Sequence, residues 1–333
     1  MSETKIISLE KLSEFGSTEN LNEQAKSLLN QQKEIWEMAG RNFEALTRIQ
    51  TRDFDFKHFK VTTQFNPERI RSSAAKTDAK SLAERPCFLC CENLYDKQRG
   101  VLFQEKYMIL INLFPIFSNH LVIAAVEHVP QQILPYFADM LDLSEKLSDF
   151  TVFYNGPKCG ASAPDHFHFQ AIGKGNLPIE NEFELLEKSY SETLVQTEKL
   201  KIISVEKYLR KFVAIVSSDK RIIKEKFEQI YNLMDLQDGE EPMMNVLCNF
   251  TGDKWHVIIF PRAKQRPSCF FREGDEKIVV GAATVEMGGV IVLPREEDFM
   301  KITSDDIAEI YDDVIISDKK FSDLIGCIKN IGI

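Results

Sequence analysis

The sequence predicts an α+β fold in which a duplicated antiparallel sheet packs against helices. Apolar residues recur at three- to four-residue spacing over residues 18–49, as expected for a long helix. Further along, short runs of β-branched and aromatic residues are joined by short connections, which favours antiparallel pairing with helices on one face. The order helix, strand, strand also occurs twice, after residue 130 and after residue 219. This repetition indicates an internal duplication.

The expected elements follow in chain order. The long helix has a packing role, and residues 59–65 alternate in character like a strand. Residues 72–84, rich in Ala, Lys and Ser, form either a loop that closes over a ligand or a solvated linker. The first half of the sheet comprises strands at 107–112, 120–125, 151–155 and 166–172, with a helix at 130–149. The second half comprises strands at 211–217, 243–250 and 255–261 with a helix at 219–236, then two strands within 278–294 and a helix at 304–316 capped by Ser304.

Composition is that of an intracellular protein. The chain has 333 residues, which is enough for two domains or one duplicated domain. Its net charge of -10 opposes nonspecific binding to nucleic acid, so an anionic ligand has to be held by local groups. The seven cysteines form no disulfide pattern, which favours a reducing compartment. No apolar leader or membrane-spanning run is present, and we expect a cytoplasmic location.

The segment that follows residue 165 carries candidate catalytic groups. In an extended strand, His166, His168 and Gln170 share one face, and the residues between them point into the core. The alternative is an ordinary amphipathic strand that happens to be rich in histidine. Two of only six histidines fall in this segment, which argues against that alternative. The exposed face therefore offers a candidate nucleophile.

A second group of residues has the spacing of a metal site. Cys87 and Cys90 form a C-x-x-C pair that can grip one tetrahedral zinc ion from a tight turn. His128 and His166 could supply the other two ligands. Buried structural cysteines or a redox pair are the alternatives, although no βαβ pattern surrounds the pair. The adjacent Cys91 leaves open which thiols bind.

These residues also carry a family resemblance. Cys87 to Asn93 resembles the Cys-x-Leu-Cys-x-x-Asn zinc motif of hexose-1-phosphate uridylyltransferases, and Gly160 to Gln170 resembles their Gly-x-Ser-x-Pro-His-x-His-x-Gln active-site strand. Those enzymes belong to the histidine-triad superfamily, with the diadenosine tetraphosphate phosphorylases and the GDP-hexose phosphorylases. Asn112 to Pro115 is similar to the stretch that lines their nucleoside pocket, and residues 119–128 resemble the hairpin that ends in a metal ligand. Residues 66–71 resemble, more weakly, an N-terminal cluster that contacts phosphates.

The resemblance implies a mechanism and a set of site residues. His168 would attack the α-phosphorus of a nucleoside diphosphate compound and form a nucleotidyl-histidine. An acceptor would then attack that intermediate, and His168 would leave. Ser162 and Gln170 would hold the phosphate oxygens, and because a carboxamide cannot shuttle protons, transfer is favoured over hydrolysis. A closed structural Zn²⁺ site made of Cys87, Cys90, His128 and His166 would fix the strand. The implied nucleotide contacts are Asn112, Asn155, Gly160, Ala161, Arg69 and Arg71.

The sequence departs from the family pattern at two positions. Asp165 lies between Pro164 and His166, where the transferases have Pro directly before His. It could form a bulge that keeps the register, or it could displace the Ser162 loop. Phe169 replaces the transferase glycine and is closer to the GDP-hexose phosphorylases, so the acceptor could be inorganic phosphate.

The second half carries fewer candidate groups. Residues 255–260 stand where the active strand stood, but with one histidine and no glutamine, so this half should be structural or substrate-binding. Arg262, Lys264 and Arg266 then form either a phosphate grip or a solvated basic turn. We therefore expect three regions: residues 1–84 with the N-terminal helix and a phosphate-contacting strand and loop, 85–200 as a catalytic histidine-triad-like half with the zinc site, and 201–333 as a degenerate half.

The expected function is that of a nucleotidyltransferase or phosphorylase. Its substrate would be a nucleotide sugar or a dinucleoside polyphosphate, and its acceptor phosphate or a sugar phosphate. Two alternatives stay open: a nucleotide hydrolase of the histidine-triad type, and a non-catalytic, zinc-stapled nucleotide-binding protein in which Asp165 distorts the loop. The sequence does not indicate the base, the sugar or the oligomeric state, and it allows a homodimer.

Overall fold

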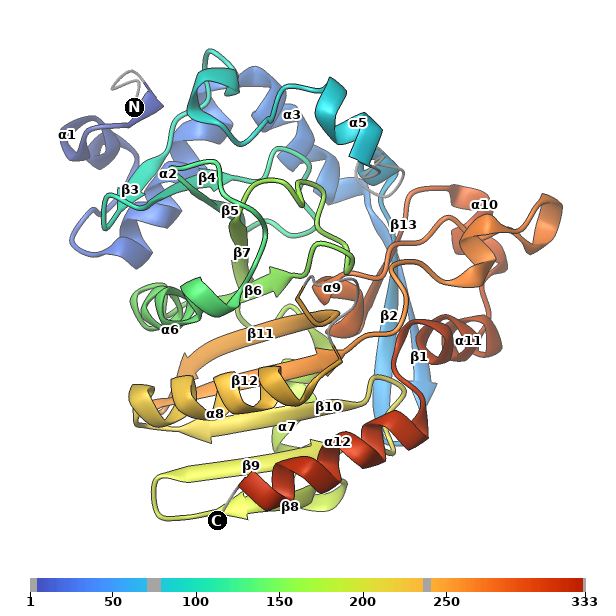
Figure 1. Ribbon diagram of the computed structural model, residues 1–333. Helices are drawn as coiled ribbons and strands as arrows, with labels where there is room; N and C mark the ends of the chain where they lie inside the picture. The colour runs from blue at the N-terminus through green and yellow to red at the C-terminus, as the bar shows by residue number, and fades with distance from the viewer. Residues whose placement is uncertain (1–4, 71–78, 236–240, 332–333) are drawn as a thin grey trace.

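The chain folds around one ten-stranded antiparallel sheet, seen in a computed structural model that describes residues 5–70, 79–235 and 241–331 (Figure 1). The order of the strands is β3-β4-β5-β7-β6-β11-β12-β10-β9-β8. Their bounds are β3 (Val101–Phe103), β4 (Tyr107–Ile111), β5 (His120–Ala125), β6 (Phe150–Asn155), β7 (His168–Gly173), β8 (Glu192–Gln196), β9 (Leu200–Val205), β10 (Phe212–Ser217), β11 (Met244–Thr251) and β12 (Lys254–Pro261). The expected α+β class is confirmed.

The sheet consists of two similar halves that meet where β6 pairs with β11. The order β4-β5-β7-β6 in the first half corresponds to β9-β10-β12-β11 in the second. In the first half, Gln170 of β7 pairs with residues of β5 and β6. In the second half, Ile258 of β12 pairs with residues of β10 and β11 at the equivalent place. His256 therefore corresponds to His168, and the glutamine position is occupied by isoleucine.

Helices cover one face of this sheet. The main ones are α2 (Leu21–Ile35), α3 (Glu37–Ala45), α6 (Phe137–Lys146), α8 (Lys220–Leu233) and α12 (Asp318–Ile331). Their apolar side chains join those of the sheet in one buried cluster. Within it, the rings of Phe137 in α6 and Phe227 in α8 stack with centroids 3.6 Å apart. One helix of each half thus contacts the other directly.

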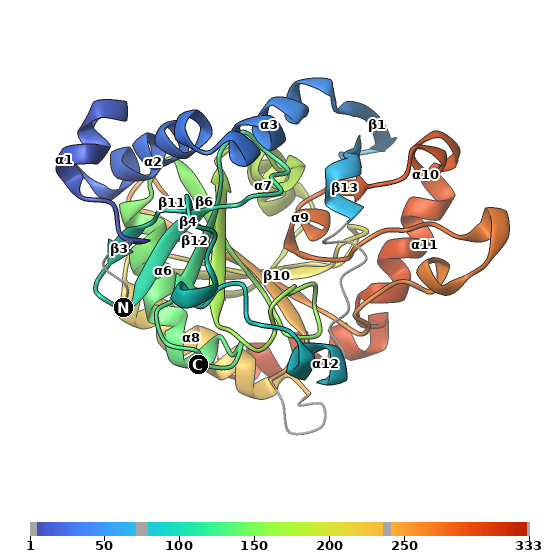
Figure 2. The same cartoon turned by 90° about the horizontal axis from the view of Figure 1, so that it is seen from above.

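The opposite face of the sheet is covered by other elements in the second half but not in the first. Over the second half it is covered by a small sheet, by helices α10 (Glu296–Lys301) and α11 (Ser304–Val314), and by α7 (Pro178–Ser189). The small sheet has the order β1-β2-β13, with β1 (Gln50–Phe56), β2 (Phe59–Phe65) and β13 (Val290–Leu293). Figures 1 and 2 show this layer on the side away from α6 and α8. Its core takes in Phe212, Ile258 and Phe260, so apolar packing fills the face that bears the candidate site in the first half.

Three expected helices differ from the prediction, one by an internal break and two at the N-terminal end. The long helix at 18–49 is broken at Trp36, whose backbone is extended and whose buried ring packs 5.4 Å from that of Tyr95. The helix expected from residue 130 begins with a short 3-10 turn (Leu134–Tyr136), with Pro135 in its first positions, and becomes α-helical at Phe137. The N-cap of α11 is Thr303, not Ser304, because the Thr303 hydroxyl accepts a hydrogen bond from the Asp306 backbone amide.

Two further predictions are corrected in part. Residues 79–84 of the expected loop form helix α5 (Ala79–Glu84), and residues 71–78 lie outside the described residues. Only β13 forms in the segment 278–294, because Thr284–Met287 make the short helix α9. The Glu286 carboxylate accepts a hydrogen bond from the Ala283 backbone amide and so caps this helix. The apolar sequence of the segment did not reveal this cap.

Among the helices of the described ranges, none combines the length and the apolar character that crossing a lipid bilayer requires.

The stacked pair that joins the two halves gives a stability prediction. Phe227 is fully buried, so Phe227→Ala should lower the free energy of unfolding by about 3 to 5 kcal/mol through lost burial and the cavity left behind. Leu185→Ala, at a side chain 47% exposed on α7, should stay within about 0.5 kcal/mol. Urea denaturation measures both. Equal losses for the two variants would contradict this account of the core.

Candidate functional site

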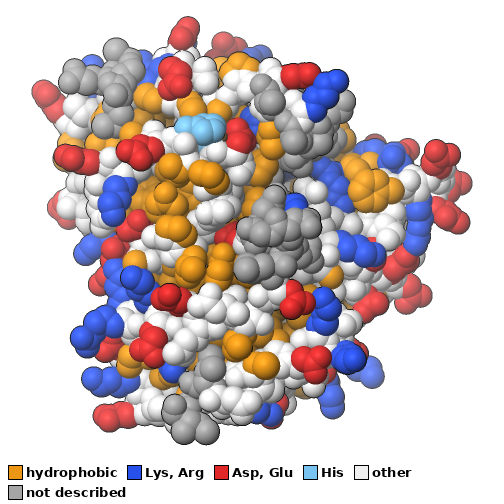
Figure 3. All heavy atoms as spheres, in the orientation of Figure 1, with side chains coloured by type: hydrophobic (Ala, Val, Ile, Leu, Met, Phe, Trp, Pro, Cys, Tyr) orange, Lys and Arg blue, Asp and Glu red, His pale blue; other side chains and the backbone are white. Residues whose placement is uncertain are grey.

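A cavity of about 600 Å³ lies on the uncovered face of the first half. Its wall includes residues of β4, β5 and β7, the loop at 160–162, and the segment before α9. In the view of Figure 3, apolar side chains gather in the middle of the molecule and charged ones predominate around its margin. Phe88 and Tyr95, about half exposed, also line the cavity. A partly apolar cavity with a few convergent polar groups is typical of a small-molecule site.

His168 lies in this wall with its ring orientation fixed. Its Nδ1 is 2.9 Å from the carbonyl oxygen of His166, which can only accept, so Nδ1 carries the proton and Nε2 keeps its lone pair. Burial lowers the pKa of His168 to about 4, so the ring is neutral at neutral pH. The backbone is held as well, because the Gln131 carboxamide accepts from the His168 amide at 2.8 Å and donates to its carbonyl at 3.0 Å. The arrangement presents an uncharged, oriented nitrogen to the cavity.

Gln170, two residues along the same face, has a defined amide orientation. Ile116 donates its backbone N–H to Nδ1 of His120, so His120 carries its proton on Nε2. This Nε2 donates to Oε1 of Gln170 at 2.9 Å, and Asn112 donates to the same oxygen at 3.3 Å. Since that oxygen is occupied, the NH2 group of Gln170 is the part that can serve a ligand.

His120 is one of the site residues whose role the sequence did not reveal. The sequence places it only within a hairpin, yet in the structure it sets the orientation of Gln170. Burial, and next the charge of Arg69, lower the pKa of His120 to about 3, so its ring is neutral. The signal that could have revealed His120 is its position at the start of β5. The next two residues, Leu121 and Val122, pair with residues 171 and 170 of β7, which brings His120 near Gln170.

The loop at 160–162 approaches the segment before α9 closely. Gly160 has φ +95°, and a Cβ built there would lie 2.4 Å from the Cβ of Ala283. Only glycine fits both the conformation and the space. Ala161 is buried, and Ser162 lines the cavity with Gly160. The loop is thus held against the C-terminal half while its edge faces the site.

Asn155, at the end of β6, holds this junction together. Its Oδ1 accepts from the amide and the hydroxyl of Thr284, at 2.8 and 2.7 Å, and from Asn245 at 3.0 Å. Its carbonyl side is therefore committed to the protein, and any contact with a ligand has to come from Nδ2.

The extra residue Asp165 is absorbed in a turn. The His166 amide donates to the Ala163 carbonyl at 3.1 Å, which places Pro164 and Asp165 at the centre of the turn. Phe167 then pairs through its backbone with Ala125 and Val129. Of the two possibilities raised by the sequence, the register of His168 is kept, and Ser162 stays at the cavity.

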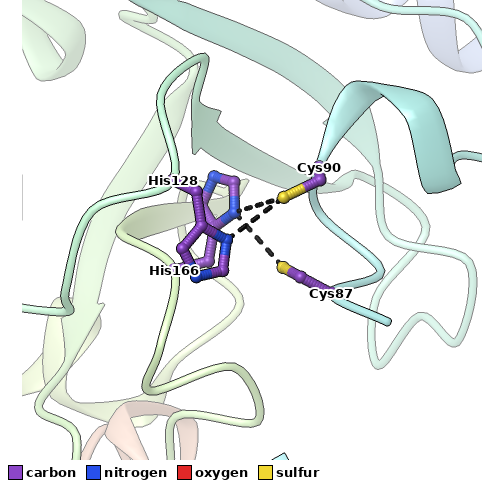
Figure 4. Close-up of side chains that lie close together, drawn as sticks. All are labelled: Cys87, Cys90, His128 and His166. Carbon is purple, nitrogen blue, oxygen red and sulfur yellow. Dashed lines mark hydrogen bonds between the residues drawn. The ribbon is translucent and has the colours of Figure 1, made fainter. Parts of the chain in front are cut away.

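The predicted metal ligands come together from three segments. The ligand atoms of Cys87, Cys90, His128 and His166 all lie within 4.8 Å of one another (Figure 4). Sγ of Cys87 is 3.2 Å from Nδ1 of His166, and Sγ of Cys90 is 3.1 Å from Nδ1 of His128. The Nε2–H of His166 donates to the Ala125 carbonyl at 2.8 Å, which leaves Nδ1 free to bind. Cys91 packs instead near Leu94, Met108 and Leu110, so it lies outside this cluster.

The donor set fits a metal ion. Burial, and next the neighbouring Cys87 thiol, raise the pKa of Cys90 to about 12, so two thiolates are disfavoured here without a cation. A bound cation reverses that preference. Two sulfur and two imidazole donors in one cluster could therefore bind a metal ion.

Some of the predicted basic residues line the cavity and others do not. Arg69 lines the cavity and donates to the Phe114 carbonyl at 2.7 Å, while Arg71 lies outside the described residues. Burial lowers the pKa of Arg69 to about 10, and the charge of Glu286 opposes this shift. Of the later basic run, Arg262 is buried and donates to Asn245 and to backbone carbonyls, and Lys264 pairs with Asp313. Only Arg266 of that run lines the cavity.

Comparisons with known proteins agree with this fold. Residues 28–173 match a domain of unknown function, DUF4922, and residues 185–332 match the GDPGP1-like C-terminal domain. No curated protein sequence matches the chain.

Among solved structures, yeast Ap4A phosphorylase Apa2 is similar with 15% identity and a TM-score of 0.54 over 85% of this chain and 94% of its own. Its complex with AMP aligns with 15% identity and a TM-score of 0.53, over 84% of this chain and 95% of its own. Its complex with Ap4A aligns with 14% identity and a TM-score of 0.51, over 85% and 97%. The resemblance seen in the sequence is thus confirmed for the fold.

The buried neutral ring of His120 predicts a pH dependence of stability. The pKa of His120 is about 3 in the folded chain against the usual value of 6.5. As the pH falls below 6.5, the unfolded chain therefore binds a proton at His120 that the folded chain does not yet bind. The stabilisation is complete above pH 6.5 and is lost as the pH falls toward 3, by up to about 1.4 kcal/mol per pH unit. Denaturation at pH 6.5 and 4.5 should show a smaller loss for His120→Gln than for the parent. The control His58→Gln, at an exposed histidine, should keep the parent's slope; three equal slopes would contradict the assignment.

Proposed function

We propose that this chain, which shares the fold of yeast Ap4A phosphorylase and carries a GDPGP1-like C-terminal domain, is a nucleotidyltransferase that acts as a phosphorylase. Its donor would be a nucleotide sugar or a dinucleoside polyphosphate. The observation that carries the proposal is the neutral His168 ring, whose protonated Nδ1 is fixed on a carbonyl oxygen and whose Nε2 is left for the cavity. A nitrogen in this state can act as a nucleophile toward phosphorus.

The proposed reaction has two displacements. In the first, the lone pair of His168 Nε2 forms a bond to the α-phosphorus, and the bond from that phosphorus to the bridging oxygen breaks. The leaving group, a sugar 1-phosphate or a nucleotide, takes the electron pair. In the second, an oxygen of inorganic phosphate attacks the same phosphorus, the phosphorus–nitrogen bond breaks, and the pair returns to Nε2. With phosphate as acceptor, the second product is a nucleoside diphosphate.

The surrounding residues would stabilise charge on the phosphoryl oxygens. We assign donor roles to the NH2 group of Gln170, the Ser162 side chain, and the backbone amides of Gly160 and Ala161. Asn112 would contact the nucleoside, Asn155 would contribute Nδ2, and Arg69 would neutralise phosphate charge. The fixed acceptors of Gln170 and Asn155 support these roles, because they orient the donor side of each carboxamide.

Transfer is favoured over the two alternative functions. Gln170 cannot pass a proton to or from water, and the imidazole behind it, His120, is buried and neutral. A hydrolase would have to activate water by another route. The non-catalytic alternative depended on distortion of the Ser162 loop by Asp165, and the turn at 163–166 removes that reason.

We further propose that the Cys87, Cys90, His128 and His166 cluster holds a structural zinc ion. All four donors come from the protein, so the site has no open position at which to activate a water molecule. Its ligand His166 is two residues before His168, and the same residue's carbonyl fixes the His168 ring. These residues would therefore keep the nucleophile's strand in place.

Three expectations from the sequence stay proposals. They are the division of the chain at residues 84 and 200, a cytoplasmic location, and assembly as a homodimer.

The nucleophile assignment predicts a covalent adduct. A nucleotide-sugar or dinucleoside polyphosphate donor, added without acceptor, should leave one nucleotide per active site on His168, stable in base and released in acid. Intact mass and peptide mapping measure it across a panel of such donors. His168→Ala should form no adduct yet remain folded.

His256→Gln is the matched control, because it replaces the histidine that corresponds to His168 on β12, outside the cavity wall, and should still allow an adduct. An adduct that maps to His120 or His256, or normal turnover by His168→Ala, would contradict the proposal.

The zinc proposal predicts about one zinc ion per chain in protein purified without chelator. Cys90→Ser should lower both the metal content and the melting temperature, because binding is coupled to folding. Elemental analysis and thermal denaturation test this. Cys91→Ser alters the neighbouring thiol outside the cluster and should leave the metal content unchanged. Metal-free protein of unchanged stability would overturn the assignment.

A further inference from the structure

Two arginines of the cavity each retain a buried N–H group without an acceptor. Among the described residues, Nε of Arg69 and Nη1 of Arg85 are buried and have no hydrogen-bond partner. The other three such nitrogens, Nε, Nη1 and Nη2, all belong to Arg210, which lies in the second half and stacks over Tyr208. An unpaired buried donor is costly, so each such case calls for an explanation. For Arg69 and Arg85, both in the cavity wall, a ligand oxygen would supply the missing acceptor.

The guanidinium plane of Arg85 is fixed by three contacts. Nη2 donates to the carbonyl oxygen of Ser162 at 3.2 Å and to Oδ1 of Asp165 at 3.1 Å. The group also lies over the ring of Phe88, 4.9 Å from its centroid. Since Nη2 is occupied and the plane is held, Nη1 has a set direction. Arg85 is thereby tied to the same loop that carries Ser162.

Asp165 connects this arginine to the metal cluster. Its second oxygen, Oδ2, lies 3.9 Å from Nε2 of His128. Both members of the Arg85 and Asp165 pair are about one-quarter exposed, so the pair is only partly screened by solvent. Asp165 thus holds a cation in the wall of the cavity.

The charges around the cavity favour an anion. Among its lining residues, Arg69, Arg85 and Arg266 are cationic and Glu286 is the one acidic side chain. The chain as a whole carries a net charge of -10, so this excess of positive charge is local. A planar guanidinium with a free N–H suits the oxygens of a phosphate group.

We propose that Arg85 is a phosphate-binding residue of this site, and that Asp165 is the positioning residue that aims it. Nη1 of Arg85 donates to a non-bridging oxygen of a diphosphate group, beside the oxygens held by the Ser162 loop. Asp165 acts only through Arg85. The inference rests on the proposed function for the identity of the natural ligand.

Binding of inorganic pyrophosphate to the full chain tests the inference, because it needs neither a nucleobase nor the nucleophile. Arg85→Gln should weaken pyrophosphate binding about tenfold or more, the scale of a lost charge-assisted hydrogen bond, and Arg85→Lys should weaken it less. Asp165→Asn should weaken binding in the parent but cause no further loss in the Arg85→Gln background. Titration calorimetry measures all four variants and the parent.

Two controls separate positioning from a general loss of structure. Arg41→Gln removes an exposed arginine that pairs with Glu37 on α3 and should not change the affinity. Metal content and melting temperature of Asp165→Asn should stay close to the parent's, since Asp165 is not itself a metal ligand. A purely structural role would lower both and would add to the effect of Arg85→Gln.

The outcomes are distinct from those of the proposed function. If the parent does not bind pyrophosphate, or Arg85→Gln binds it as the parent does, the inference is overturned, even if His168 forms its adduct. If the Arg85 and Asp165 effects are additive, the positioning role is overturned. If pyrophosphate binding depends on Arg85 but no donor modifies His168, the inference stands and the proposed function fails.

Discussion

The hydrogen bond from Nδ1 of His168 to the carbonyl of His166 is the interaction on which the site depends. It determines which ring nitrogen keeps its lone pair, and it joins the last residue of the 163–166 turn to the first residue of β7. Burial then keeps the ring uncharged. Gln131 fixes the backbone of the same residue, and β7 is paired on both sides, with β5 and β6. Any shift of β7 by one residue would turn this face into the core.

The duplicated sheet explains how such a strand can be held so firmly. β7 occupies the first half, and the second half offers the same strands with Ile258 at the position equivalent to Gln170. The small sheet and the C-terminal helices close over that second face, while Ala283 and Thr284, at the start of α9, contact Gly160 and Asn155. The second half thus acts as a support for the loop of the first. Residues 283 and 284, which contact the first half, belong to the same structural layer as the buried core of the second half.

Much of this arrangement could be predicted from the sequence because the relevant signals are local. Alternation identified the two faces of residues 166–171, and the C-x-x-C spacing identified the thiols. What could not be predicted depends on contacts between distant segments. The role of His120 arises from Gln170, fifty residues away, and that of Arg85 from Asp165, eighty residues away. The helix break at Trp36 depends on packing near Tyr95, and α9 formed where a strand was expected because Glu286 caps it.

The central claim is that the nucleotidyl group passes through His168 in two displacements. The stereochemical course at phosphorus tests this most directly. A donor with a single sulfur in place of one α-phosphoryl oxygen, of known configuration, is converted with phosphate, and the configuration of the product is determined by phosphorus NMR. Two in-line displacements, each with inversion, predict net retention. Net inversion would mean that the acceptor attacks the donor directly, and it would contradict the account.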